Sequence, residues 1–302
     1  MIARRLAYAA LAALALAVMV FWFATRTVAG QEFGDDAYEA RFVADPSVRD
    51  AARDFLGLLT HGSLLLVGAC LVIIALVRRR PRLAIGVGAL VFGTAFLAEV
   101  LKTFIPRAEL GVDPFELAHN TGPSGHASIS MAIALATVMV VPMRWRVPVA
   151  AIGGVLVAIM ATSTLAAGWH RPGDALAGEL MATAIALGVA AVLVMIRGAG
   201  NMVAVRSAAS AVRWWVYAVL ALPVLIVVID IALLPEAATA DTGHADFVVA
   251  AVLIALLALA CVAAVVALLR DVDLDPPSRG AVEADDPQPG AGADPQSNAG
   301  AA

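Results

Sequence analysis

Long apolar runs constrain the fold of this chain more than any other feature of its sequence. Each run is close to the roughly 17 to 25 residues that an α-helix needs to cross a bilayer. There are eight, at about 7–25, 57–77, 83–101, 126–142, 147–167, 174–196, 215–234 and 247–269. Hydrophobic residues make up 62% of the 302 residues and charged residues only 15%, which is outside the range of soluble domains. The sequence therefore predicts an all-α fold, a polytopic transmembrane helix bundle.

The distribution of arginine predicts how this bundle is oriented. With eight helices, one side of the membrane receives Arg4, Arg5, Arg78, Arg79, Arg80, Arg82, Arg144, Arg146, Arg197, Arg206, Arg213 and Arg270. Because cytoplasmic loops carry the excess of positive charge, we expect a multi-pass protein of the cell membrane with both termini in the cytoplasm. The opposite, extracytoplasmic side then receives segments 31–53, 102–125 and 235–246 and the turn around His170. For the first run, a cleaved signal peptide ending near Ala29 is the alternative to a retained anchor.

The segments between and after the runs predict three units. Residues 1–198 form a six-helix core, residues 199–270 add two transmembrane helices, and residues 271–302 form a disordered cytoplasmic tail rich in Asp, Pro, Gly and Ala. Residues 35–56 mix apolar with charged side chains, which indicates either an interfacial helix or an irregular solvated loop. The chain has no basic footprint of the kind that binds nucleic acid, so its expected surroundings are the bilayer.

The tetrapeptide Pro123-Ser124-Gly125-His126 begins the fourth apolar run. The free backbone N–H groups at the start of a helix attract phosphate. The alternative is an ordinary helix start that Ser124 caps. Lys102, the one lysine of the chain, stands shortly before this tetrapeptide at the outer end of the third run. The two features together indicate a phosphate pocket at the membrane surface.

His170 and Asp174 stand four residues apart where the sixth run begins. That spacing places both side chains on one face of a helix. An aspartate in this position can hold one imidazole nitrogen and leave the other free to attack. The pair is a weak signal by itself, but the predicted topology brings it to the same outer surface as Lys102 and His126.

These residues together resemble the type 2 phosphatidic acid phosphatase superfamily, whose signature is K-x6-R-P, then P-S-G-H, then S-R-x5-H-x3-D. The second motif is intact as Pro123-Ser124-Gly125-His126, and the third is similar to Ser163–Asp174, with His170 and Asp174 in register. The first is degenerate at Lys102–Arg107, where the gap is shorter and the proline precedes the arginine. The resemblance implies a membrane phosphatase core of six helices.

The resemblance also implies a role for each matching residue. His170 would be the nucleophile, Asp174 would orient it, and His126 would protonate the leaving group. The phosphoryl oxygens would be held by Lys102, Arg107, Ser124 and Gly125. This scheme needs no metal and no other cofactor. The expected substrate is a lipid phosphate: phosphatidic acid, phosphatidylglycerol phosphate, or a polyprenyl phosphate or diphosphate.

One departure from the third motif affects the predicted site. Thr164 occupies the position of the phosphate-binding arginine, and a hydroxyl does not replace a bidentate guanidinium. We hypothesise that Arg171 supplies the missing charge; the alternative is that it meets lipid headgroups. Glu99 either pairs with Lys102 or lies unpaired at the rim, and His61 is interpreted as structural or solvated. The competing prediction for the whole chain is a non-catalytic membrane transporter or scaffold that retains the phosphatase fold.

Overall fold

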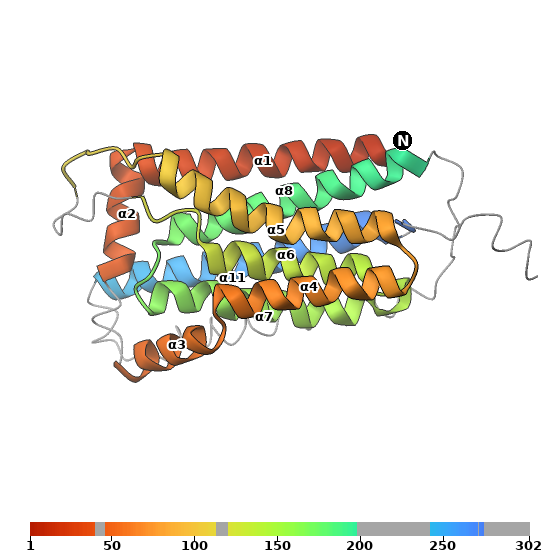
Figure 1. Ribbon diagram of the computed structural model, residues 1–302. Coiled ribbons are helices and arrows are strands. Elements are labelled where there is room, and N and C mark those ends of the chain that lie inside the picture. The colour runs from red at the N-terminus through yellow and green to blue at the C-terminus, as the bar shows by residue number, and fades with distance from the viewer. Residues whose placement is uncertain (40–45, 113–119, 198–241, 271, 275–302) are drawn as a thin grey trace, which may run out of the picture.

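The computed structural model describes residues 1–39, 46–112, 120–197, 242–270 and 272–274 (Figure 1). Its helices are α1 (Ile2–Arg26), α2 (Val28–Glu39), α3 (Pro46–Leu58), α4 (His61–Val77), α5 (Pro81–Phe104), α6 (Gly125–Val140), the 3₁₀ turn η2 (Met143–Trp145), α7 (Arg146–Ala166), α8 (Pro172–Arg197) and α11 (Thr242–Leu269). Within these ranges, five helices are long and apolar enough to cross a membrane, or six if the bent pair α3 and α4 is one span. The predicted all-α polytopic bundle is therefore confirmed.

Seven of the eight predicted apolar runs coincide with helices, and the run at 215–234 lies outside the described residues. Helix α6 is the shortest of the seven at 16 residues, yet it is buried everywhere except at Ile133 and Thr137. A helix that is apolar all round is expected to be buried by its neighbours. Helices α4, α5, α7, α8 and α11 all contact α6, so this helix forms the centre of the bundle.

Two amphipathic helices, α2 and α3, lie at one end of the bundle (Figure 1). Helix α2 crosses that end and contacts α1, α8 and α11, while α3 contacts α7. The irregular loop considered for residues 35–56 is therefore wrong wherever the structure describes this segment. These two helices matter for the site because they lie against the loops that carry the predicted motifs.

At the opposite end of the bundle, two arginines bind backbone carbonyls at the carboxyl end of α11. Arg5 donates to the Leu268 carbonyl at 3.0 Å, and Arg146 donates to the Val272 carbonyl at 2.9 Å. Cations are favourable there because the last carbonyls of a helix carry partial negative charge. Val272 and Leu274, which follow α11, are buried. Most of the described arginines lie at this end, in agreement with the pattern in the sequence.

Candidate active site

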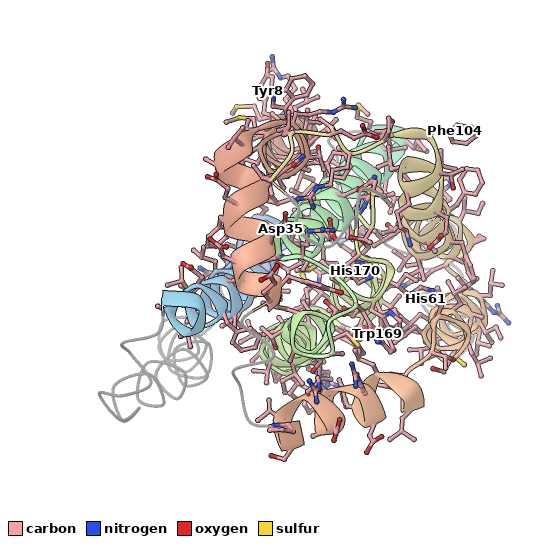
Figure 2. The ribbon with its side chains drawn as sticks, turned by 90° about the vertical axis from the view of Figure 1, so that its left-hand side faces the viewer. Tyr8, Asp35, His61, Phe104, Trp169 and His170 are labelled. Atoms are coloured by element: carbon pink, nitrogen blue, oxygen red, sulfur yellow. The ribbon has the colours of Figure 1, made fainter. Side chains whose placement is uncertain are left out.

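The predicted site residues come together at the end of the bundle opposite to these arginines, the end that Figure 2 shows facing the viewer. Lys102 is in the last turn of α5, Arg107 follows that helix, and His126 is the second residue of α6. The connection between α7 and α8 carries His170 and Arg171, with Asp174 in the first turn of α8. Three segments that are distant in sequence therefore meet as the pattern predicts.

The end of α7 fixes the backbone of the predicted nucleophile. Gly168 has a φ of +73°, and its N–H donates to Leu165 while that of Trp169 donates to Thr164, both at 2.9 Å. This is the Schellman arrangement, in which a glycine in the left-handed region ends a helix. The N–H of His170 donates to the same Thr164 carbonyl at 3.2 Å. The helix ending therefore holds His170 directly beside the first turn of α8.

Asp174 links the predicted motifs to one another. Its Oδ2 accepts from the Thr121 hydroxyl and, at 3.1 Å, from the Arg171 N–H, and it lies 3.5 Å from Nδ1 of His170. The N–H of Ser124 donates to the backbone carbonyl of Asp174 at 2.9 Å. Imidazole–carboxylate contacts of catalytic pairs are often longer than 3 Å in unliganded sites. With Nδ1 facing Asp174, the Nε2 atom of His170 is the nitrogen left for chemistry.

The start of α6 has the features of an anion site. The Ser124 hydroxyl accepts from the Ala127 N–H at 3.4 Å as the helix cap, and Ser124 is fully buried. The first amides of a helix, here those of Gly125 and His126, have no carbonyl partner within their own helix. The phosphate-binding start and the ordinary start capped by Ser124 are therefore compatible, because a capped helix also presents N–H groups to an anion.

His61, which was interpreted as structural or solvated, lies in the site (Figure 2). Its ring centroid is 4.2 Å from that of His126, and Trp169 lies 5.4 Å from His126. The Nε2 atoms of both histidines are buried without a hydrogen-bond partner among the described residues. A Cβ on Gly125 would lie 2.7 Å from Nε2 of His61, so glycine is required there for the two helices to approach. The sequence did contain a signal: His61 lies near the start of the apolar run at 57–77, on the predicted outer side.

Lys102 is paired with Glu99, one helical turn before it. Its ammonium lies 2.6 Å from Oε1 of Glu99, and 19% of the Lys102 side chain is exposed against 61% for Glu99. The carboxylate also borders the start of α6, at 3.7 Å from where a Cβ on Gly125 would be. The ammonium is therefore held beside the histidines by a carboxylate that is itself open to solvent.

The two predicted phosphate-binding arginines form a separate group around Asp35, a residue of α2 that sequence reasoning missed. Arg107 donates Nη2 to Oδ2 of Asp35 at 2.9 Å, and Arg171 donates Nε to Oδ1. All three side chains are buried. Burial and the neighbouring Arg171 lower the pKa of Arg107, and Asp35 opposes that shift. No motif contains Asp35, so only the packing of α2 reveals this contact.

The family comparison bears directly on this arrangement. Residues 57–197 match the family model of the PAP2 superfamily. This region, a little under half of the chain, is assigned to the PAP2 superfamily. That membership supports a phosphatase-type activity on phosphate esters. No curated protein and no solved structure matches the chain. The histidines, Lys102 and both arginines lie inside the PAP2 region, whereas Asp35 lies before it.

The PAP2 region departs from the third motif mainly at Thr164, where the motif has an arginine. Thr164 is fully buried in α7, and its hydroxyl donates to the Ala161 carbonyl at 2.7 Å. Its carbonyl accepts the two N–H groups that end the helix. The hydroxyl and the carbonyl of Thr164 therefore both take part in hydrogen bonds at the end of α7. Arg171, seven residues later, is next to the predicted nucleophile in sequence, and its backbone N–H donates to Oδ2 of Asp174 at 3.1 Å.

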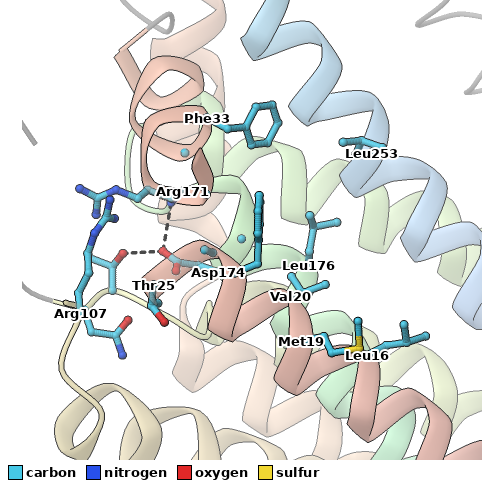
Figure 3. Close-up of a pocket in the computed structure, with 17 residues that line it drawn as sticks. Leu16, Met19, Val20, Thr25, Phe33, Arg107, Arg171, Asp174, Leu176 and Leu253 are labelled. Atoms are coloured by element: carbon cyan, nitrogen blue, oxygen red, sulfur yellow. Dashed lines mark hydrogen bonds between the residues drawn. The ribbon is translucent and has the colours of Figure 1, made fainter. Parts of the chain in front are cut away.

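A groove of about 390 Å³ reaches the arginines from the apolar flank of the bundle (Figure 3). Its apolar walls include Leu16, Met19, Val20, Phe33, Leu176 and Leu253. Its polar end is formed by Arg107, Asn120, Thr121, Arg171 and Asp174. His61, His126 and His170 do not line it. Helices α1, α2 and α11, which lie outside the PAP2 region, supply much of this groove.

Proposed function

We propose that this protein is a membrane lipid phosphate phosphatase that works through a phosphohistidine at His170. The observation that carries the proposal is the contact of His170 Nδ1 with Asp174, which is joined by the Ser124 N–H to the start of α6. A nucleophile, the carboxylate that orients it and a set of anion-binding amides are thereby held in one unit. This is the arrangement that phosphoryl transfer to a histidine requires.

The chemistry follows from the positions of these groups. The Nε2 lone pair of His170 attacks the phosphorus, the bond from phosphorus to the leaving oxygen breaks, and His126 gives that oxygen its proton. Asp174 stabilises the positive charge that develops on the imidazole through Nδ1–H. Water then attacks the phosphorus, the P–N bond breaks, and His126 takes the proton of that water. The amides of Gly125 and His126 and the ammonium of Lys102 stabilise the charge on the phosphoryl oxygens.

Two features support a lipid as the substrate. The site lies at the end of a bundle of apolar helices, where the headgroup layer of a bilayer meets them. Most of the arginines that the structure describes lie at the other end, which supports cytoplasmic termini and an extracytoplasmic site. A phosphorylated lipid can then present its headgroup to the site while its tail remains in the membrane.

Phosphate release from lipid phosphates by the purified full-length protein tests this proposal. Wild type is expected to release phosphate with a chelator present, His170→Ala to release none, and denaturation during turnover to trap an acid-labile phosphoprotein. Within the described residues no group of three His, Cys, Asp or Glu side chains is placed to share a metal ion, and the chelator tests metal independence directly. Activity that persists in His170→Ala contradicts the phosphohistidine. Absence of release from every substrate favours the non-catalytic transporter or scaffold.

A further inference from the structure

The Asp35 carboxylate binds the two arginines much as a phosphoryl group would. Arg107 Nη2 lies 3.1 Å from Oδ1 and 2.9 Å from Oδ2, and Arg171 Nε donates to Oδ1 as well. The exposed fractions of Asp35, Arg107 and Arg171 are 6%, 7% and 6%. Guanidinium groups bind carboxylate and phosphate oxygens with the same planar geometry. The carboxylate is therefore a chemical substitute for an anionic headgroup at this pair.

Two hydrogen bonds hold helix α2 in place with Asp35 beside the arginines. The Tyr38 hydroxyl donates to the Gly168 carbonyl at 2.8 Å, next to the predicted nucleophile. The Gln31 amide donates to the Ala108 carbonyl at 2.7 Å, directly after Arg107 in sequence. These contacts join α2 to both loops that carry an arginine. Asp35 therefore has a fixed place in the fold and does not sample the arginines from a loose surface helix.

The balance of charge explains why a carboxylate is present. Burial lowers the pKa of Arg107, and the neighbouring Arg171 lowers it further. Two buried cations without an anion would destabilise the empty site. When a phosphate binds the same pair, however, Asp35 adds a negative charge next to another negative charge. A resident carboxylate stabilises the empty site and weakens the bound state.

An anion can reach this pair along the groove (Figure 3). Arg107 and Arg171 line its polar end, and the remaining walls are mostly apolar. Gly34 also lines the groove, and a Cβ on it would lie 3.7 Å from Cδ of Arg171. Asp35 itself does not line the groove, although Phe33 and Gly34, which precede it on α2, do. A headgroup in the groove would therefore meet the same two guanidinium groups that Asp35 binds.

We propose that Asp35 is the resident counter-ion of the Arg107–Arg171 pair and that it competes with phosphate for this pair. The inference rests on the proposed function, in which Lys102 and the helix amides bind the phosphoryl group, and extends it by adding both arginines as ligands of the phosphate of substrate and product. Asp35 acts through the arginines and does not touch the reacting atoms, so it is a positioning residue. Its effect is to keep product phosphate weakly bound and its release fast.

The test measures how strongly inorganic phosphate raises the thermal unfolding midpoint of the full-length protein, which gives a dissociation constant without any turnover. Asp35→Asn is expected to bind phosphate about tenfold or more tightly than wild type, because a like charge within several ångströms is removed. Asp35→Glu keeps the negative charge, and its dissociation constant for phosphate is expected to resemble that of wild type. Asp36→Asn removes an exposed carboxylate of the same helix and is expected to change the constant far less than Asp35→Asn. Asp35→Ser replaces the asparagine variant if that variant does not fold.

Kinetics with a lipid phosphate give a second, independent readout. In Asp35→Asn the KM is expected to fall while kcat does not rise, because substrate and product both bind more tightly. Equal or weaker phosphate binding by Asp35→Asn, or the same shift in Asp36→Asn, overturns the inference. So does a wild type whose unfolding does not respond to phosphate. If no variant releases phosphate from a lipid but the tenfold difference remains, the catalytic proposal fails and the role of Asp35 stands.

Discussion

Replacing Gly122 by alanine tests whether Asp174 is as firmly held as the contacts indicate. A Cβ on Gly122 would lie 2.2 Å from Oδ1 of Asp174, about 1.2 Å closer than the 3.4 Å at which ordinary contact begins. The carboxylate cannot simply turn away, because its Oδ2 accepts from Thr121 and from the Arg171 N–H. Overpacking of this kind costs about 1–3 kcal/mol of folding stability. A displacement near 1 Å at a catalytic group lowers turnover by about 10²-fold.

Phosphate release and thermal unfolding of Gly122→Ala measure the two parts of this expectation. Gly188→Ala is the matched control, because no atom beyond its own helix backbone lies within 4 Å of that Cβ and it lies far along α8 from the site. The control is expected to keep its activity and to gain up to about 1 kcal/mol, since alanine favours a helix interior. If Gly122→Ala retains both the turnover and the unfolding midpoint of wild type, Asp174 is free to move and the assignment of its three contacts is wrong.

Three further substitutions test other parts of the site. Arg171→Ala is expected to lower turnover more than about tenfold, since Thr164 offers no guanidinium in its place; an unchanged rate in the phosphate-release assay contradicts this role. Glu99→Gln frees the ammonium of Lys102, so KM for a lipid phosphate should fall by up to about fivefold, the range of an exposed ion pair; a higher KM would show that Glu99 positions the lysine. Ser124→Ala removes the cap of α6 and should cost about 1 kcal/mol of stability, measured as a lower unfolding midpoint. A midpoint equal to that of wild type would mean that Ser124 contributes little as a cap.

The fold was predictable to the extent that single helices determine it. Length and hydropathy located the seven described apolar runs, because a segment that crosses a bilayer must satisfy its backbone hydrogen bonds within itself. The same reasoning did not distinguish the central helix α6 from those around it, since hydropathy alone does not say which neighbours a helix has. Residues 35–56 remained ambiguous because a short amphipathic helix and a charged loop have similar composition.

The site was predictable only for the residues that belong to motifs. His126, His170 and Asp174 come together at one end of the bundle, because each begins or precedes an apolar helix on the predicted outer side. His61 and Asp35 were not assigned. A lone histidine or aspartate in a sequence has no spacing from which a partner can be inferred, and each of these two meets residues more than sixty positions away.

The sequence by itself determined that this chain is a bundle of apolar helices, that most of its arginines lie toward one end and that a histidine–aspartate pair lies toward the other. These properties follow from local hydropathy, charge and helical spacing, which do not depend on the rest of the fold. Only the tertiary structure decided that the predicted phosphate ligands form two groups, with Lys102 beside the histidines and the arginines around Asp35. The physical reason is that a buried charge takes whichever opposite charge the packing brings within reach, and α2 brings Asp35.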